Sequence, residues 1–223
     1  MDYYPLWNSL RIAGISTIII FIIGIAVANL VTYLPKWAKG TLDCIFTLPL
    51  VLPPTVIGYL LLRILGSKRV IGKAFLSVFG IKLTMNWWSA IFATSVVIFP
   101  LMYRTARGAF EAFDKNLEWA GKSLGLSRSY IFFRVKMPCC KQGIIAGCVL
   151  AFARALGEYG ATSMIAGYIP GRTATISTTV YQLWRTGKDD LATKWVLINI
   201  AISAVVLISI NMIEDKSRTA KYD

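Results

Sequence analysis

The sequence contains no histidine, and only 11 of its 223 residues are acidic. Without histidine, the chain lacks the most common general base of enzymes and a frequent ligand of zinc. The four cysteines form no C-x-x-C pair, so neither a disulfide framework nor a metal site is predicted; they are Cys44, Cys139, Cys140 and Cys148. We therefore expect no catalytic residue, no metal site and no cofactor bound by this chain.

Apolar residues make up 56% of the chain, and the mean hydropathy is +0.61. Soluble domains usually contain about 45–50% apolar residues, so the composition indicates a membrane protein. The net charge of +13 would suggest nucleic acid in a soluble protein, but no basic domain stands apart from the apolar segments. The lysines and arginines are instead typical of the loops of a membrane protein, with a lipid bilayer rather than nucleic acid as partner.

Five segments are long and apolar enough to be membrane-spanning helices, which need about 20 residues. They cover residues 12–34, 42–65, 88–102, 143–166 and 195–213. The first resembles a signal peptide with a possible cleavage site at Ala26-Val27-Ala28, but its apolar run continues to Leu34, which favours an uncleaved span. The sequence thus predicts one all-α integral membrane domain over residues 1–223.

The distribution of basic residues predicts the orientation. An odd number of spans puts the chain ends on opposite sides. One side carries thirteen lysines and arginines, among them Lys216, Arg218 and Lys221 of the tail, and the other carries ten. Because cytoplasmic loops are enriched in lysine and arginine, we expect the N-terminus outside and the C-terminus in the cytoplasm.

The cytoplasmic loop at residues 111–138 is basic and yet has an apolar stripe at helical spacing, formed by Phe113, Leu117, Ala120 and Leu124. Gly125 favours a helix end, Ser127 a new helix start, and Pro138 limits the second helix. The pattern therefore predicts two short helices joined at a glycine. They could lie on lipid headgroups or bind a soluble partner, and the periodicity does not decide between these alternatives.

This loop resembles the last large cytoplasmic loop of permease subunits of bacterial ABC importers, which carries a sequence motif. That motif reads EAA, three residues, G, nine residues, I, one residue, LP. The residues at these spacings are Trp119-Ala120-Gly121, Gly125, Val135 and Met137-Pro138. Trp119 occupies the glutamate position, and Glu118 lies one residue earlier. The resemblance implies that the loop couples the permease to an ATPase through Leu117, Glu118, Trp119, Ala120, Gly121, Leu124, Gly125 and Leu126.

Residues 47–62, 98–110 and 149–183 are similar to segments of molybdate permeases in the same family. The resemblance implies a type I ABC importer transmembrane domain (MetI-like), with about five spans and cytoplasmic coupling helices. It also implies a homodimer, two ATPase subunits that bind ATP and Mg, and an extracytoplasmic molybdate-binding protein, in a bacterial-type inner membrane. The chain itself would be a transport subunit and not an enzyme.

Two groups of residues are candidates for the translocation pathway or its gate. Pro53 and Pro54 force a bend in the second span, and backbone freed at a bend is tolerated beside a water-filled path, which makes these prolines and Thr55 candidates; a packing kink is the alternative. Arg154 and Glu158 can pair at i, i+4 in the fourth span, and Thr162 is grouped with them. Arg154 could assist an oxyanion, but a purely structural pair is the favoured interpretation.

Gly121-Lys122-Ser123 superficially resembles a phosphate-binding loop, but Asn116 stands where that motif needs glycine. ATP binding is therefore assigned to a separate subunit. A permease for sulfate, thiosulfate or tungstate remains an alternative, because no residue in the sequence indicates the size of the transported ion. A secondary transporter and a membrane-embedded lipid enzyme are more remote alternatives.

Overall fold

The computed structural model describes residues 2–219, with the side chains of residues 2–208, and every regular element in this range is helical. Met1 and residues 220–223, including Lys221 of the predicted tail, lie outside the described residues. The helices are α1 (Tyr4–Thr32), α2 (Lys36–Val51), α3 (Pro54–Leu65), α4 (Val70–Phe79), α5 (Trp87–Glu111), α6 (Lys115–Ser123), α7 (Arg128–Ile131), a π-helix (Phe132–Lys136), α8 (Met137–Cys139), α9 (Lys141–Leu156), α10 (Gly160–Ile165), α11 (Ile176–Arg185) and α12 (Asp189–Thr219).

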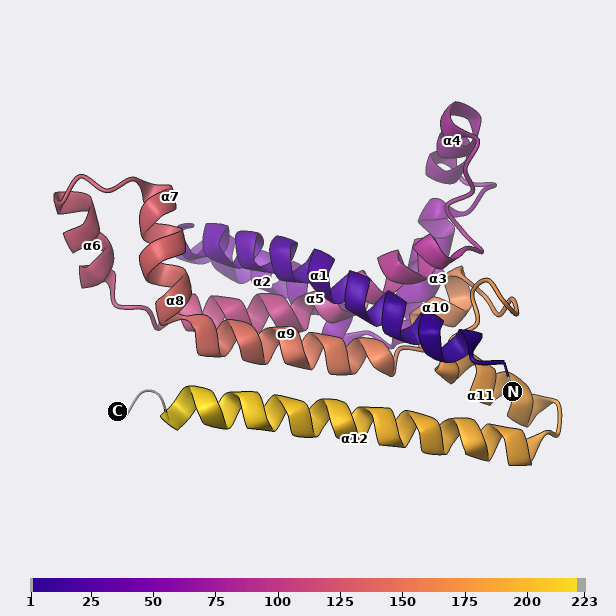
Figure 1. The fold of residues 1–223 in the computed structure, drawn as a ribbon. Helices are drawn as coiled ribbons and strands as arrows, with labels where there is room; N and C mark the ends of the chain where they lie inside the picture. Colours follow the sequence, from indigo (N-terminus) through magenta and orange to yellow (C-terminus); the bar gives the residue numbers. More distant parts are fainter. Residues whose placement is uncertain (1, 220–223) are drawn as a thin grey trace.

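The long helices α1, α5 and α9 pack together as the centre of an elongated bundle, and α12 runs alongside α9 (Figure 1). The 29 residues of α1 extend about 44 Å at 1.5 Å per residue, more than the hydrocarbon thickness of a bilayer. Ile98, Met102 and Tyr103 of α5 are fully buried between these helices. A second, smaller core joins α3 and α10 to the first part of α5.

Glycines allow the central helices to approach closely. A Cβ added at Gly24 of α1 would lie 2.9 Å from Met102 Cγ, and one added at Gly143 of α9 would lie 2.7 Å from Ala109 Cβ. Gly147, one turn after Gly143, faces Thr105 in the same way. Small residues at helix contacts are typical of membrane bundles, where packing replaces the hydrophobic effect between helices.

Within residues 2–219, three helices are long and apolar enough to cross a membrane unaided, namely α1, α5 and α12 over Asp189–Ile208. Two bent helix pairs raise this number to at most five. One pair is α2 with α3, which meet at 109°, and the other joins Arg128–Cys139 to α9 at 75°. The bend between α2 and α3 falls at the prolines of the second predicted span, because neither Pro53 nor Pro54 can continue the hydrogen bonds of α2.

Several helices extend beyond or break within the ranges predicted from the sequence. α1 begins at Tyr4 instead of residue 12. Two of its early polar side chains bind the backbone before and at the start of α11: Asn8 Nδ2 donates to the carbonyl of Ala174 at 2.9 Å, and Ser9 Oγ accepts from the amide of Ile176 at 2.9 Å. α5 continues past residue 102 to Glu111. The fourth predicted span, residues 143–166, is interrupted between Leu156 and Gly160, where α9 stops and α10 begins.

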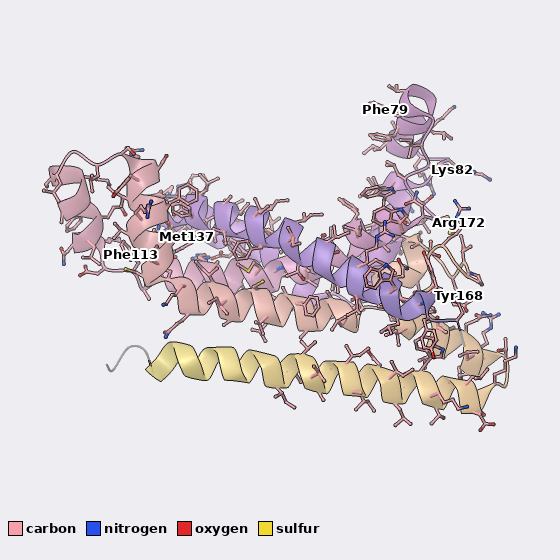
Figure 2. The ribbon with its side chains drawn as sticks, in the orientation of Figure 1. Phe79, Lys82, Phe113, Met137, Tyr168 and Arg172 are labelled. Atoms are coloured by element: carbon pink, nitrogen blue, oxygen red, sulfur yellow. The ribbon has the colours of Figure 1, made fainter. Side chains whose placement is uncertain are left out.

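The two ends of the bundle are built differently. Phe113 and Met137 lie at the end that carries α6, α7 and α8, while Phe79, Lys82, Tyr168 and Arg172 lie toward the other end (Figure 2). At this second end, α1 starts and α4 projects away from the bundle (Figure 1). α12 then runs back to the end at which α6 and α7 lie (Figure 1). The start of α1 and the end of α12 therefore lie at opposite ends of the bundle.

Candidate functional site

The loop from α6 to α7 has the two short helices and glycine junction that the sequence predicts. The amide of Gly125 donates to the carbonyl of Lys122 at 3.0 Å, and the amide of Leu126 donates to the carbonyl of Gly121 at 3.1 Å, which together form a Schellman motif. Gly125 has φ +76°, a left-handed conformation that disfavours other residues. Ser127 Oγ then accepts from the amide of Tyr130 and caps α7.

An apolar surface of α6 is exposed at this end of the molecule. Leu117, Trp119 and Leu124 are 45%, 59% and 78% exposed, and Ala120 is exposed beside them. We call these four residues the coupling surface, after the role that the sequence resemblance implies for this loop. Large exposed apolar side chains on a short polar helix are typical of a protein contact or a membrane surface.

Phe113 is not part of this surface. The prediction that it shares one helical stripe with Leu117, Ala120 and Leu124 was therefore wrong for Phe113. α5 ends at Glu111 and α6 begins at Lys115, with the side chain of Asp114 accepting from the amide of Asn116 as the N-cap. Phe113 therefore lies in the turn before α6, where it is buried in the main core. The spacing from Phe113 to Leu117 matched a helix, but the start of α6 falls between these two residues, and the periodicity of apolar residues does not show that start.

The other side of α6 faces the bundle. Gly121 is buried against Ile131 of α7, where an added Cβ would lie 3.0 Å from Ile131 Cγ1. Leu126 is half-buried after the turn. Glu118 turns inward, with its Oε1 2.6 Å from Lys122 Nζ and its Oε2 accepting from the Tyr33 hydroxyl at 3.5 Å. Glu118, one residue before the motif's glutamate position, and Trp119, which occupies that position, therefore have different surroundings: Glu118 is half-buried and Trp119 is exposed.

Lys136 connects this loop to α1, and sequence reasoning treated it as an ordinary cytoplasmic charge. It is 4% exposed, and its Nζ donates to Asn29 Oδ1 at 2.8 Å and to the Tyr33 hydroxyl at 3.5 Å. Burial lowers the pKa of Lys136, while the nearby carboxylate of Glu118 acts in the opposite direction. No pattern in the sequence signals this contact, because Asn29 and Lys136 are brought together by tertiary packing.

The candidate pathway residues at the second predicted span lie where two helix breaks meet. Pro53 is the N-cap of α3, Pro54 is its first residue, and Thr55 is exposed. A Cβ on Gly160, the first residue of α10, would lie 2.9 Å from both Pro54 Cβ and the Thr55 amide nitrogen. The break between α2 and α3 is therefore packed directly against the break between α9 and α10.

The ion pair predicted from the i, i+4 spacing is present, with Arg154 Nη1 2.8 Å from Glu158 Oε2. Glu158 is 3% exposed, and its Oε1 accepts from the amide of Ala161 at 2.8 Å. The carboxylate thus caps the start of α10 while it pairs with α9. Thr162 is also buried, and its hydroxyl lies 3.4 Å from that of Thr94 in α5. These contacts connect α10 to α9 and α5, and the role of Arg154 in a structural pair or in an oxyanion path stays a prediction.

A polar network joins α2 to α5 near the same end as the coupling surface, and the sequence did not indicate it. Arg107 pairs with Asp43 of α2 and with Glu111 one turn later, and the Tyr103 hydroxyl donates to Asp43 Oδ1 at 2.6 Å. Lys39 lies 3.9 Å from Glu111. These contacts explain how α5 remains helical and partly buried past residue 102 despite its charged residues.

No cluster of three or more potential metal ligands is present within residues 2–219. Gly121-Lys122-Ser123 forms the last turn of α6, whereas a phosphate-binding loop precedes the start of a helix. The described side chains therefore offer no nucleotide-binding loop of that kind.

Residues 20–216 match the family described as "Binding-protein-dependent transport system inner membrane component". This chain belongs to that family. The match covers most of the sequence and includes the coupling surface, both helix breaks and the Arg154–Glu158 pair. The chain is thus a multi-pass inner-membrane transport subunit, as the resemblance of the loop at residues 111–138 predicts.

Two curated relatives are similar over nearly their whole length. The molybdenum transport system permease protein ModB of Escherichia coli (strain K12) is 40% identical over 209 residues, covering 92% of this chain and 91% of that protein. A protein of Bacillus subtilis (strain 168) described as a "Putative molybdenum transport system permease protein YvgM" is 37% identical over 205 residues, covering 92% and 90%.

The fold is also similar to that of a solved transporter. The structure titled "Inward facing conformations of the MetNI methionine ABC transporter" gives a TM-score of 0.72 at 15% sequence identity, covering 95% of this chain and 94% of that chain. At this identity, the likeness concerns the fold alone. The predicted MetI-like type I importer transmembrane fold is confirmed.

Proposed function

We propose that this chain is the membrane-spanning permease subunit of an ATP-driven importer that moves molybdate into the cytoplasm. The choice of molybdate as the substrate rests on the 37–40% identity to molybdenum permeases over 92% of the chain. The chain acts as a transport subunit and performs no covalent chemistry. ATP and Mg bind to a partner subunit.

The coupling surface supports a separate ATPase as partner. Leu117, Trp119 and Leu124 expose apolar area on a helix that the Schellman turn and the Ser127 cap hold in a defined position. A docked ATPase subunit would bury this area, and its movement on ATP binding would be passed to α7 through the contact between Gly121 and Ile131. This favours the protein-docking alternative over a helix pair that lies on lipid.

A second copy of the chain completes the proposed permease, with one ATPase subunit for each copy. No residue of α2 is buried within the single chain, and Trp37, Ile45 and Val51 are 77%, 56% and 81% exposed. A homodimer places a substrate path between two copies. The facing breaks at Pro53–Pro54 and Gly160 are the proposed wall of this path, where exposed Thr55 supplies a hydroxyl.

The proposed orientation follows the positive-inside rule. The coupling surface and the end of α12 face the cytoplasm, and the start of α1 and α4 face the outside. An extracytoplasmic molybdate-binding protein delivers the anion at the end that carries Lys82 and Arg172 (Figure 2). Weak binding within the path suits transport, because a strong cationic site would retain a divalent anion.

The test is molybdate uptake into vesicles that contain this chain, its ATPase partner and its binding protein, with sulfate and tungstate as competitors. We expect uptake that excess sulfate does not inhibit and that tungstate blocks, since tungstate closely matches molybdate in size and charge. Uptake of sulfate in place of molybdate would contradict the substrate and leave the ABC importer architecture intact.

A further inference from the structure

A cavity of about 460 Å³ opens between the last turn of α1 and the inner side of the coupling helices. Its polar lining consists of Asn29, Tyr33, Glu118, Lys122, Arg128 and Lys136. These residues come from α1 and its C-cap, α6, α7 and the π-helix, so a ligand here would contact all four of these elements. The cavity lies apart from the exposed coupling surface and from the paired helix breaks.

Lys136 is a buried cation, and no carboxylate lies within ion-pair distance of it among the described side chains. Its Nζ contacts the neutral Asn29 Oδ1 and Tyr33 hydroxyl, and it lies 4.9 Å and 4.8 Å from the ring centres of Tyr33 and Phe110. Ring faces and amide oxygens stabilise an ammonium but do not neutralise it. Buried lysines are almost always paired with an anion, because removing an ammonium from water costs several kcal/mol.

The charges around the cavity leave an excess of positive charge. Its wall holds Lys122, Arg128 and Lys136 against one carboxylate, that of Glu118. Glu118 pairs with Lys122 at 2.6 Å, and its second oxygen accepts from the Tyr33 hydroxyl, which also contacts Lys136. One carboxylate therefore faces three cations, and neither Arg128 nor Lys136 forms an ion pair among the described side chains. Arg128 is exposed at the start of α7, where its guanidinium can offer two parallel donors to an oxyanion.

We propose that this cavity binds a phosphate group, with Arg128 and Lys136 as its cationic ligands. The group belongs either to an anionic phospholipid or to inorganic phosphate. Leu30, Ile131 and Phe132 line the same cavity, and an apolar wall beside cations suits a lipid headgroup at the end of a spanning helix. The bound anion would hold α1, α7 and the π-helix together behind the coupling surface. This proposal depends on the membrane fold and not on the transported substrate.

The first test purifies the permease, with its ATPase partner where the two co-purify, from membranes rich in phosphatidylglycerol. Native mass spectrometry then measures the retained phosphatidylglycerol in the wild type, Arg128→Gln, Lys136→Met and Arg134→Gln. Arg134 is the matched control, because it is an exposed cation on the same π-helix and does not line the cavity. We expect each pocket substitution to weaken retention roughly fivefold and the control to leave it unchanged.

The second test measures amide hydrogen exchange of residues 115–139 in delipidated protein, with and without millimolar inorganic phosphate. Protection by phosphate that requires Arg128 and Lys136, without charge-dependent lipid retention, identifies the free anion as the ligand. Lipid retention that depends on the same two residues identifies the phospholipid. Equal behaviour of all four proteins in both tests, or an equal loss in Arg134→Gln, overturns the proposal. Arg128 is exposed, so Arg128→Gln remains informative even if Lys136→Met fails to fold.

Discussion

Glu158 is a carboxylate buried inside a membrane bundle, and its two contacts explain how it is tolerated. One oxygen pairs with Arg154, and the other accepts the amide of Ala161 at the start of α10. The arrangement supplies a hydrogen-bond acceptor for an amide at the start of α10, and the negative charge of a carboxylate is favourable near a helix N-terminus. The pair therefore has a structural task whether or not an anion passes nearby.

We predict that Arg154→Met alone destabilises the permease by about 1–3 kcal/mol, because it leaves the buried carboxylate without its cation. Arg154→Met combined with Glu158→Gln should recover most of this loss, since the amide oxygen can still cap α10 and no charge remains unpaired. Thermal unfolding in detergent measures both effects, and molybdate uptake by the double variant measures function.

The outcome separates the two roles considered for Arg154. A double variant with recovered stability and normal uptake supports the structural pair. A double variant that is stable but does not transport would contradict it and assign Arg154 to the oxyanion path.

At the scale of elements, the central feature is the contact between two interrupted helices. α3 starts at the Pro53–Pro54 break, α10 starts after the break at residues 157–159, and both are too short to cross a bilayer alone. Gly58 permits the contact, since an added Cβ would lie 2.8 Å from Ala161 Cα. Because backbone atoms form this contact, a side chain cannot be accommodated by a rotamer change.

Gly58→Ala is therefore predicted to destabilise the permease by about 1–3 kcal/mol, the usual cost of overpacking, and to reduce uptake. The matched control is Gly14→Ala in α1, where an added Cβ meets nothing within 4 Å. This control should be neutral or stabilise by up to about 1 kcal/mol. Unfolding of both variants in the same detergent is the measurement, and equal stability would contradict the close contact.

Single residues in the sequence predicted the junction between α6 and α7, but no pattern in the sequence predicted the tertiary contacts of this loop. Gly125 and Ser127 specify a helix end and a helix start through their own backbone and side-chain preferences, so the junction was recognisable. The burial of Lys136 depends on Asn29, more than one hundred residues away in the chain. The interruption after Leu156 was also missed, because an apolar run records hydropathy and not the cap that Glu158 provides.

For the whole molecule, the proposed direction of transport depends on the two ends of the bundle being different. The coupling surface lies at one end, and α4 with the loop around Arg172 lies toward the other (Figures 1 and 2). The Tyr4 hydroxyl donates to the Arg172 carbonyl at 2.7 Å, so the start of α1 is fixed to that loop. Transport requires these ends to face opposite sides of the membrane.

Thiol labelling tests this orientation. In chains whose other cysteines are replaced by serine, a membrane-impermeant maleimide should label Ser77→Cys on α4 in intact spheroplasts. It should label Cys139, which is exposed at the end of α8, only after the membrane is permeabilised. Labelling of Cys139 in intact spheroplasts, with Ser77→Cys protected, would invert the proposed topology.

The most direct test of the account substitutes the coupling surface and measures molybdate uptake and ATP hydrolysis in the same proteoliposomes. The variant is Leu117→Ser with Leu124→Ser, and the control is Val78→Ser on α4, whose side chain is 72% exposed at the other end. Since buried interface anchors contribute about 2 kcal/mol or more each, we predict that uptake falls at least about tenfold in the double variant, with unchanged thermal stability of the permease and normal uptake in the control. Uptake at the wild-type rate in the double variant would contradict the claim that this surface couples ATP hydrolysis to transport.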